Sequence, residues 1–210
     1  MTRHERPETP AVRAAPLARV PALAWLMAHA YARSRPRAVL AYPIALATTL
    51  TYALRGGVYE SDDQNGMVIV ARWRFGLDML TLTSVMVLGL LALAPVAVLA
   101  SLVHPLLGPA TYVLAGATTV AGALVLAQGQ ETATPIARNT PTTGDRWQIA
   151  ALAQRPGTRL SAMLLTRRVI GSVVPPGDVL VVSAVTADLE QAYIRAGFTP
   201  LGRKRLYKIA

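Results

Sequence analysis

The fold is decided by residues 79–130, which read MLTLTSVMVLGLLALAPVAVLASLVHPLLGPATYVLAGATTVAGALVLAQGQ. This stretch contains no Lys, Arg, Asp or Glu, and it lies between Asp78 and Glu131. A helix that crosses a membrane needs about 20 apolar residues, so the stretch is long enough for two. We predict a transmembrane α-helical hairpin of Met79–Val103 and Leu106–Ala127. The alternative, a hairpin buried in a soluble core, is disfavoured because helices of soluble proteins normally carry a polar face.

Two features inside the stretch support a hairpin. Its middle reads His104-Pro105-Leu106-Leu107-Gly108-Pro109, where two prolines and a glycine end one helix and begin another. In the second helix, small side chains recur on one face, which suits helix packing and a homo-oligomer formed through such faces. These small residues are Ala115, Thr119 and Ala123.

The composition narrows the function classes. Hydrophobic residues make up 53% of the 210 residues, which is typical of an integral membrane protein. Cysteine is absent, which excludes disulfides and thiolate metal sites, and we predict no metal site. Lys and Arg number 21 against 11 Asp and Glu, so nucleic acid, anionic lipid or a phosphorylated ligand could bind. Nucleic acid is disfavoured because the aromatic side chains of such surfaces are missing, and membrane lipid is the expected partner.

The distribution of charge predicts the topology. Basic residues gather before and after the apolar stretch, and basic segments near membrane spans favour the cytoplasmic side. We therefore predict a multi-pass protein of the cell membrane whose two termini and soluble part are cytoplasmic.

The chain before the hairpin divides into three parts. Residues 1–16 are rich in proline and charge and predict a mobile basic arm. Residues 17–54 predict two apolar or interfacial helices, Leu17–Tyr31 and Ala38–Leu54. The second is at the lower limit of spanning length. Either it lies along or partly in the membrane, which we favour, or it crosses together with Leu17–Tyr31. Residues 55–78 predict a strand hairpin.

That strand hairpin consists of Val58–Ser61 and Met67–Arg74, joined by turn residues that include Asn65-Gly66. An Asn-Gly pair between apolar runs is a strong signal for a β-hairpin. Because two strands alone are marginally stable, the hairpin should join a larger sheet.

The larger sheet is predicted after a polar linker, residues 128–145. In residues 146–210, strands and helices alternate, which predicts an open sheet with helices against it. The expected strands are Trp147–Gln154, Asp178–Ala184, Phe198–Leu201 and Arg205–Ile209; the expected helices are Leu160–Gly171, with Leu160, Met163, Leu164 and Val169 inward, and Asp188–Ala196.

Two motifs of residues 146–210 resemble the C-terminal half of the GNAT superfamily of N-acetyltransferases. The first is a strand, a turn and a helix start, with the turn Gln154-Arg155-Pro156-Gly157-Thr158-Arg159-Leu160. In that superfamily the turn binds the pyrophosphate of acyl-CoA, helped by glycine and by a helix N-terminus. Either Gln154 begins the motif and Arg159 replaces its second glycine, or Gly157 is that glycine and Arg155 replaces the first.

The second motif is a helix that ends in Tyr-x-x-x-Gly-Phe, here Tyr193 to Phe198. The resemblance implies that this helix closes over the CoA arm and that Tyr193 donates a proton to the departing thiolate. It also places two helices and a strand hairpin before the CoA-binding strand. The membrane hairpin would then be inserted between the third and fourth strands of the sheet.

The resemblance thus implies a fold and a function together: a GNAT-like mixed α/β sheet combined with a transmembrane helical hairpin, residues 79–127. It implies a membrane-bound acyltransferase that moves an acetyl or acyl group from CoA to an amine acceptor at the cytoplasmic membrane face. Acetyl-CoA or another acyl-CoA is the expected cofactor, bound by Gln154, Arg155, Gly157, Thr158, Arg159 and Leu160. The alternatives are a non-catalytic protein whose GNAT-like module binds CoA or a protein partner, and a membrane assembly component. Glu60, Asp62 and Asp63 lie by a turn, and no general base is identified.

Overall fold

A computed structural model describes residues 12–32, 34–127, 140–141, 144–158, 161–184, 186–202 and 204–210. The helices are η1 (Leu17–Arg19), α1 (Val20–Tyr31), α2 (Arg35–Ala53), α3 (Phe75–Ala92), α4 (Ala94–Val103), α5 (Leu107–Ala127), α6 (Ser161–Val173) and α7 (Ala187–Arg195). The strands are β1 (Val58–Glu60), β2 (Gly66–Arg72), β3 (Arg146–Gln154), β4 (Val179–Ser183), β5 (Thr199–Gly202) and β6 (Arg205–Ile209). Most of the predicted arm 1–16 and linker 128–145 lies outside the described residues, as do Arg159 and Leu160.

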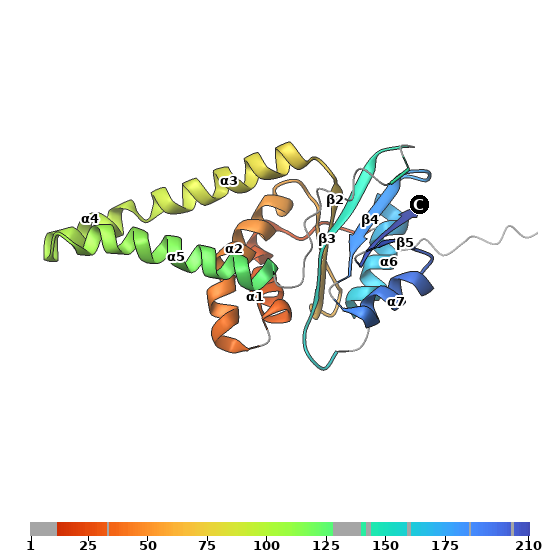
Figure 1. The fold of residues 1–210 in the computed structure, drawn as a ribbon, viewed down its shortest axis with the longest axis horizontal. Coiled ribbons are helices and arrows are strands. Elements are labelled where there is room, and N and C mark those ends of the chain that lie inside the picture. The colour runs from red at the N-terminus through yellow and green to blue at the C-terminus, as the bar shows by residue number, and fades with distance from the viewer. Residues whose placement is uncertain are drawn as a thin grey trace, which may run out of the picture.

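The strands form one mixed sheet in the order β1-β2-β3-β4-β6-β5. β3 and β4 are parallel, and the other neighbours are antiparallel. Helices α1 and α2 cover one face of the sheet, and α6 and α7 cover the other (Figure 1). The predicted mixed α/β sheet is therefore confirmed. Before α1, Ala14 forms an antiparallel bridge to Tyr59, so the chain also touches β1 near its start.

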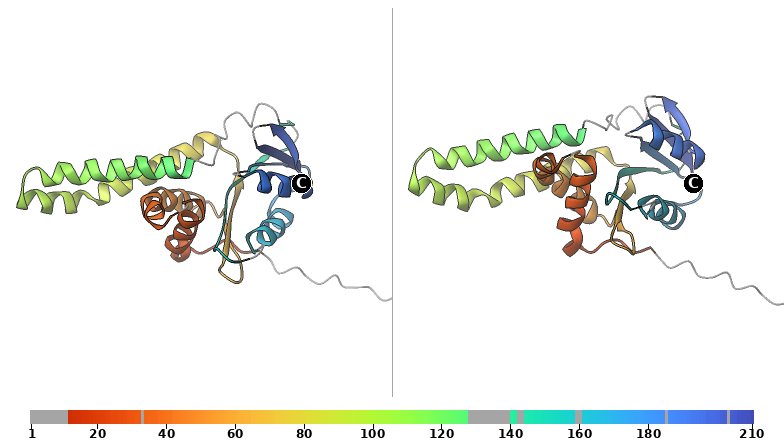
Figure 2. Two further views of the ribbon diagram at one scale, coloured as in Figure 1. Left: turned by 60° about the horizontal axis from the view of Figure 1, so that its bottom comes forward. Right: turned by 90° about the horizontal axis from the view of Figure 1, so that it is seen from below.

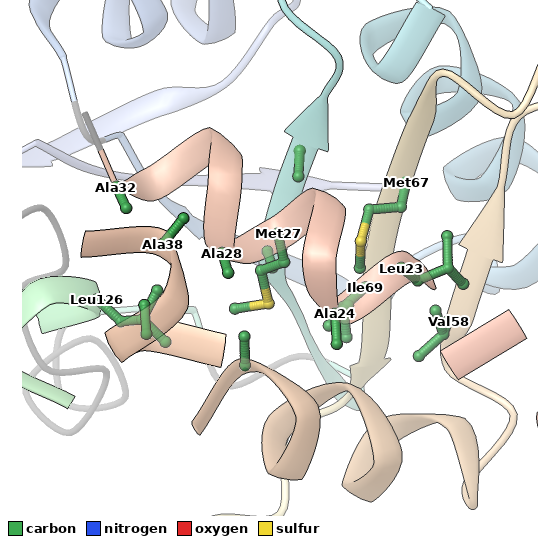
Figure 3. Close-up of a cluster of buried hydrophobic side chains, with 14 residues drawn as sticks. Leu23, Ala24, Met27, Ala28, Ala32, Ala38, Val58, Met67, Ile69 and Leu126 are labelled. Carbon is green, nitrogen blue, oxygen red and sulfur yellow. The ribbon is translucent and has the colours of Figure 1, made fainter. Parts of the chain in front are cut away.

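Each face of the sheet has its own core, because β2 is buried on both sides. Met67 and Ile69 pack with Leu23 and Met27 of α1 (Figure 3). Val68 and Val70, which alternate with them, pack in the cluster on the α6 side. A strand buried on both faces has no polar alternation, which explains the continuous apolar run in this part of the sequence.

The strand hairpin pairs with the C-terminal sheet, as the insertion hypothesis required. β2 runs antiparallel to β3 along its full length, from Gly66 opposite Gln154 to Arg72 opposite Trp147. The chain thus leaves the sheet after β2, passes through α3, α4 and α5, and returns as the neighbouring strand. The three helices are therefore an insertion between two neighbouring strands of one sheet.

The turn between β1 and β2 is longer than the Asn65-Gly66 pair predicted. The loop closes between Ser61 and Gly66, whose backbone groups are hydrogen-bonded, and the positive φ of 56° falls at Gln64. The Asp63 carboxylate accepts the Asn65 N–H at 3.1 Å and a bond from the Ser61 hydroxyl. The bond from the Ser61 hydroxyl has the larger effect and, with the bond from the Asn65 N–H, holds the pKa of Asp63 below its usual value. Both bonds stabilise the larger loop.

The helical hairpin projects away from the sheet (Figure 2). Among the described residues, two helical stretches are long and apolar enough to cross a membrane, Gly76–Val103 and Leu107–Leu126. Only 6% and 11% of their most apolar windows are buried, so the hairpin is not the core of a soluble domain. Side chains such as Leu88, Leu102 and Val113 are 65%, 78% and 72% exposed.

The predicted span Met79–Val103 lies within the first of these stretches, Gly76–Val103. One helix was predicted here, whereas the structure has two, α3 and α4, which meet at Leu93, because Pro95 has no N–H and clashes with the carbonyl four residues before it. Helix α3 also begins earlier than predicted, at Phe75, with Asp78 in the first turn, where the helix dipole favours a carboxylate.

Helix α2, Arg35–Ala53, corresponds to the predicted helix Ala38–Leu54 and is not one of the two candidate spans among the described residues. It packs between α1 and α5. A Cβ at Gly122 would lie 2.3 Å from the Leu40 carbonyl oxygen, so only glycine lets α5 cross α2 this closely. Ala115, Thr119 and Ala123 are each half-buried within the single chain, and a homo-oligomer through this face stays a prediction.

Helix α6 turns a different stripe inward from the one expected. Leu164 is 61% exposed, whereas Ala162, Leu165, Thr166 and Val169 are buried. Those four positions follow the i, i+3, i+4, i+7 spacing of one helix face, and Leu164 falls outside it.

A buried polar cluster fixes the foot of α3 to the sheet. Arg55, just after α2, forms an ion pair with Asp78 in the first turn of α3. The side-chain amide of Gln148 in β3 donates to the Asp78 carboxylate at 3.1 Å and to the Tyr52 hydroxyl at 2.9 Å. The Arg55 and Asp78 side chains are 19% and 8% exposed. Because water is largely excluded, each charge depends on its partner for stabilisation.

Replacement of Arg55 therefore tests the cluster. The variant Arg55→Gln leaves the Asp78 carboxylate without its cation and should lower the free energy of unfolding by about 3 kcal/mol. The matched control Arg72→Gln breaks the exposed pair with Asp145 (3.1 Å) and should cost less than about 1 kcal/mol. Chemical unfolding of each protein in detergent micelles, followed by circular dichroism, measures both. Equal losses would show that the cluster does not hold the hairpin.

Candidate functional site

The parallel strands β3 and β4 pair for only part of their length. Register partners run from Arg146 opposite Val179 to Ile149 opposite Val182. β3 continues for another five residues, 150–154, still paired with β2 on its other side. We call this β4-facing side of residues 150–154 the open edge of β3. An edge of this kind presents backbone donors and acceptors to whatever lies beside it.

A bulge marks the point where the open edge begins. Val70 lies opposite Ile149 and Ile69 opposite Ala151, so Ala150 is an extra residue in β3. The extra residue changes which face the odd positions point to: Trp147 and Ile149 pack on the α6 side, whereas Ala151 packs on the α1 side. Bulges bend a strand and interrupt its ladder, which accounts for the separation of β3 from β4 here.

Tyr31 contacts the open edge from the α1 side. Its hydroxyl oxygen accepts a hydrogen bond from the Leu152 N–H at 3.4 Å. Alternate residues of an antiparallel strand direct their N–H away from the partner strand, and Leu152 directs its N–H away from β2 in this way. The Tyr31 ring is half-buried and packs against the core of that face.

Tyr193 lies on the opposite face of the sheet. It is in α7, is 4% exposed, and packs against Phe198 with ring centroids 5.3 Å apart. It belongs to the buried cluster on the α6 side, against which Leu152 packs. Burial raises the pKa of Tyr193 well above its usual value, and the electrostatic effect of Tyr31 raises it further. Tyr193 therefore keeps its proton throughout the physiological pH range.

Thr186 fixes the start of the helix that carries Tyr193. Its hydroxyl oxygen accepts the Leu189 N–H at 3.2 Å and so caps the N-terminus of α7. At the other end, the Phe198 N–H donates to the Tyr193 carbonyl and Gly197 has a φ of 87°. A left-handed residue that ends a helix is usually glycine, so both ends of this short helix are fixed by its own sequence.

The turn that follows β3 is closed by its own hydrogen bonds. The Arg155 carbonyl accepts the Thr158 N–H at 3.2 Å and the Thr158 hydroxyl at 2.6 Å, and Gln154 donates its side-chain amide to the Thr158 carbonyl. The Arg155 N–H donates to the backbone carbonyl of Asn65 at 2.7 Å. Gly157 has a φ of 85° and open space where a Cβ would lie, as expected for glycine after proline in a type II turn.

The structure thus brings together only some of the predicted site residues. Gln154 is the last residue of the open edge, and Arg155, Gly157 and Thr158 follow it. Tyr193 lies in the cluster against which Leu152 packs. Arg159 and Leu160 lie outside the described residues. Tyr31, the Leu152 N–H and the bulge at Ala150 were missed. A sequence carries no signal for them, because they depend on how α1 meets β3 and on the register of β2 against β3.

The acidic residues at the β1–β2 turn form ion pairs with arginines or hydrogen bonds within their own loop. Arg19 donates to Glu60 at 3.1 Å, and Arg168 donates to Asp62 at 2.9 Å. Asp63 holds its own loop. Within the described part of the chain, no group of three His, Asp or Glu side chains is placed to hold a metal ion.

The raised pKa of Tyr193 makes a pH prediction. The folded state holds this phenol protonated, whereas the unfolded chain releases the proton above the ordinary pKa of 10.0. The stabilisation is therefore complete below pH about 10 and decreases as pH rises above it. Urea unfolding at pH 8 and pH 11 should show a smaller loss of stability for Tyr193→Phe than for the wild type. Equal losses would contradict the burial of an ionisable phenol at this position.

No protein-family model matches the chain, and a search of curated proteins finds no match either. The function of the open edge is therefore inferred from its residues and their geometry.

Proposed function

We propose that this chain is a membrane-anchored acyltransferase of the GNAT kind, which binds acyl-CoA along the open edge of β3 and transfers the acyl group to an amine at the membrane surface. The observation that carries the proposal is a backbone N–H, that of Leu152, directed away from β2 where two parallel strands separate. Leu152 packs against the cluster that contains Tyr193, a buried phenol that keeps its proton. A donor for a carbonyl and a donor for a leaving group are the two groups that acyl transfer from a thioester requires.

The element order supports the superfamily proposal. Ala14 bridges to β1, two helices follow, and β1 and β2 precede β3, the strand that carries the turn Arg155 to Thr158. This order agrees with the arrangement that the resemblance implied, with the helical hairpin inserted between the third and fourth strand segments. The neighbouring strands β3 and β4 are also the parallel pair of the sheet.

The chemistry of the open edge fits an acyl-CoA arm. That arm contains two amide groups and is extended, so it can pair with a strand edge in the way a peptide does. The Leu152 N–H already bonds to a hydroxyl oxygen at 3.4 Å, so the position accepts an oxygen ligand. When bound, acyl-CoA supplies an activated acyl thioester.

The residues of this chain then have separate roles. The Leu152 N–H binds the carbonyl oxygen and stabilises the negative charge that develops there as an amine attacks. Tyr193 gives its proton to the sulfur as the carbon–sulfur bond breaks and regains one from the attacking amine. The candidates for binding the pyrophosphate are Arg155, Arg159, Gly157 and the start of α6. The backbone N–H groups of Arg155 and Thr158 are not among them, because both are hydrogen-bonded inside the protein.

The helical hairpin supports a membrane location. α3 begins beside β2 and α5 ends beside α2, so both feet lie on the side of the sheet domain (Figure 1). Arg146 lies 5.9 Å from the ring of Trp73, just before α3, and Arg74 is exposed next to it. Tryptophan and arginine at the foot of a span are typical of a membrane interface on the cytoplasmic side.

A second candidate function is a non-catalytic module that binds CoA or a protein partner. It is favoured by the occupation of the open edge, since Tyr31 holds the Leu152 N–H. The ion pairs of Glu60 and Asp62 also leave those two carboxylates engaged. Binding and turnover measured on the same protein separate the two candidates.

Titration of the full chain in lipid nanodiscs with acetyl-CoA tests binding. We expect saturable heat at micromolar concentration, and no heat at millimolar concentration would exclude both candidates that require CoA. Release of CoA thiol in the presence of amine-bearing membranes then tests turnover. The chain has no cysteine, so a thiol reagent reports CoA alone.

Tyr193→Phe should lower thiol release about 100-fold and leave acetyl-CoA binding intact. The matched control is Tyr207→Phe, at a half-buried tyrosine of β6. It should leave both thiol release and acetyl-CoA binding unchanged. Undiminished release by Tyr193→Phe would remove the proton-donor role. Binding without release by the wild type would favour the non-catalytic candidate.

The topology has its own test, because any introduced cysteine is the single one in the chain. In intact cells, a membrane-impermeant maleimide should label His104→Cys at the tip of the hairpin and not Ala210→Cys at the C-terminus. Labelling of Ala210→Cys would place the sheet domain outside, away from cytosolic acyl-CoA.

A further inference from the structure

The bond between Tyr31 and Leu152 has features of a temporary contact. Its length of 3.4 Å is at the long end for an N–H donor, whereas well-formed bonds of this kind measure about 2.7–3.2 Å. The acceptor is a side chain, whereas in a regular sheet a backbone carbonyl of the neighbouring strand would accept the hydrogen bond of the Leu152 N–H. A backbone N–H that is shielded from water needs an acceptor. The Tyr31 oxygen supplies one at Leu152, beyond Ile149, where the pairing of β3 with β4 ends.

Tyr31 is the last residue of α1, and the backbone of Ala32 after it is extended. The anchors of α1 are Leu23, Ala24, Met27 and Ala28, which are buried one to two turns earlier (Figure 3). A rotation of the Tyr31 side chain therefore leaves these four residues in place, although its ring gives up its contact with the core of that face.

Leu152, the donor that Tyr31 contacts, also packs beside the second group that acyl transfer needs. Its side chain packs against the cluster that contains Tyr193 on the α6 side of the sheet, whereas Tyr31 comes from the α1 side. The Tyr31 hydroxyl thus occupies the donor that the proposed function assigns to the carbonyl oxygen of the thioester. A bound thioester and the Tyr31 hydroxyl cannot occupy this position together.

We propose that Tyr31 is a displaceable place-holder, whose hydroxyl occupies the Leu152 N–H in the free protein and swings out when the carbonyl oxygen of an acyl thioester takes that N–H. This inference rests on the proposed function, because it assigns the ligand of the open edge. It adds a regulatory residue that neither motif of the sequence contains: Tyr31 competes with the ligand, lowers its affinity and keeps the backbone donor satisfied until the ligand arrives.

The variant Tyr31→Phe tests the place-holder, since it keeps the ring and removes the competing oxygen. Calorimetric titration of the full chain in nanodiscs should give a Kd for acetyl-CoA about fivefold lower than that of the wild type, the change expected from loss of one competing hydrogen bond. The matched control Tyr42→Phe, a half-buried tyrosine of α2 whose ring packs on Trp25, should leave the Kd unchanged. An unchanged or higher Kd for Tyr31→Phe would overturn the proposal and indicate a ligand contact instead.

Hydrogen exchange without any ligand separates this failure from failure of the proposed function. In Tyr31→Phe, a peptide that covers residues 150–154 should exchange at least one amide faster than in the wild type, and peptides of β6 should not change. If neither protein binds acetyl-CoA, both the proposed function and the place-holder fail, even where exchange is faster. If the wild type binds and exchange is unchanged, the place-holder alone fails.

Discussion

The antiparallel pairing of β2 with β3 is the constraint on which the rest of the structure depends. The two strands are joined along the length of β2, although the chain between them makes the whole helical excursion α3 to α5. Because backbone hydrogen bonds of a sheet are directional and adjacent strands lie about 4.8 Å apart, this pairing places the point where the chain leaves the sheet beside the strand to which it returns. The start of α3 is bonded to Arg55 and Gln148, and α5 packs on α2. The folded domain therefore holds the hairpin at two points, whereas a terminal membrane anchor is held at one.

The same strand connects the hairpin to the candidate site. At its first half, β3 contributes Gln148 to the buried cluster with Asp78 and Arg55. Past the bulge at Ala150, its second half forms the open edge. A shift of the hairpin relative to the sheet would act on the start of the strand whose end contacts Tyr31. The fold thus links the foot of the apolar helical hairpin and the separation of β3 from β4 through one strand.

The sequence predicts the parts of this arrangement that depend on local patterns. Absence of charge from residues 79–130 predicts the hairpin, and short apolar runs bounded by turn residues predict most strands. Pro95, which breaks the first helix, is also a local signal that the prediction passed over. The motif predicted that a helix carrying Tyr193 ends at Gly197, and α7 ends just before that glycine, which has a positive φ. By contrast, the inward stripe of α6, the bulge and Tyr31 depend on which surfaces meet. Leu164 is apolar yet exposed because the axis of α6 relative to the sheet, and not composition, selects its buried face.

The central claim is that an acyl thioester lies along the open edge of β3, between Leu152 and Tyr193, in a sheet pinned to the membrane. A crystal structure of the full chain grown in a lipidic mesophase with acetyl-CoA tests this most directly. The account predicts ligand density along residues 150–154, with the carbonyl oxygen on the Leu152 N–H and the Tyr31 hydroxyl moved away. Density at another surface, or an open edge still held by Tyr31 at saturating acetyl-CoA, would contradict it.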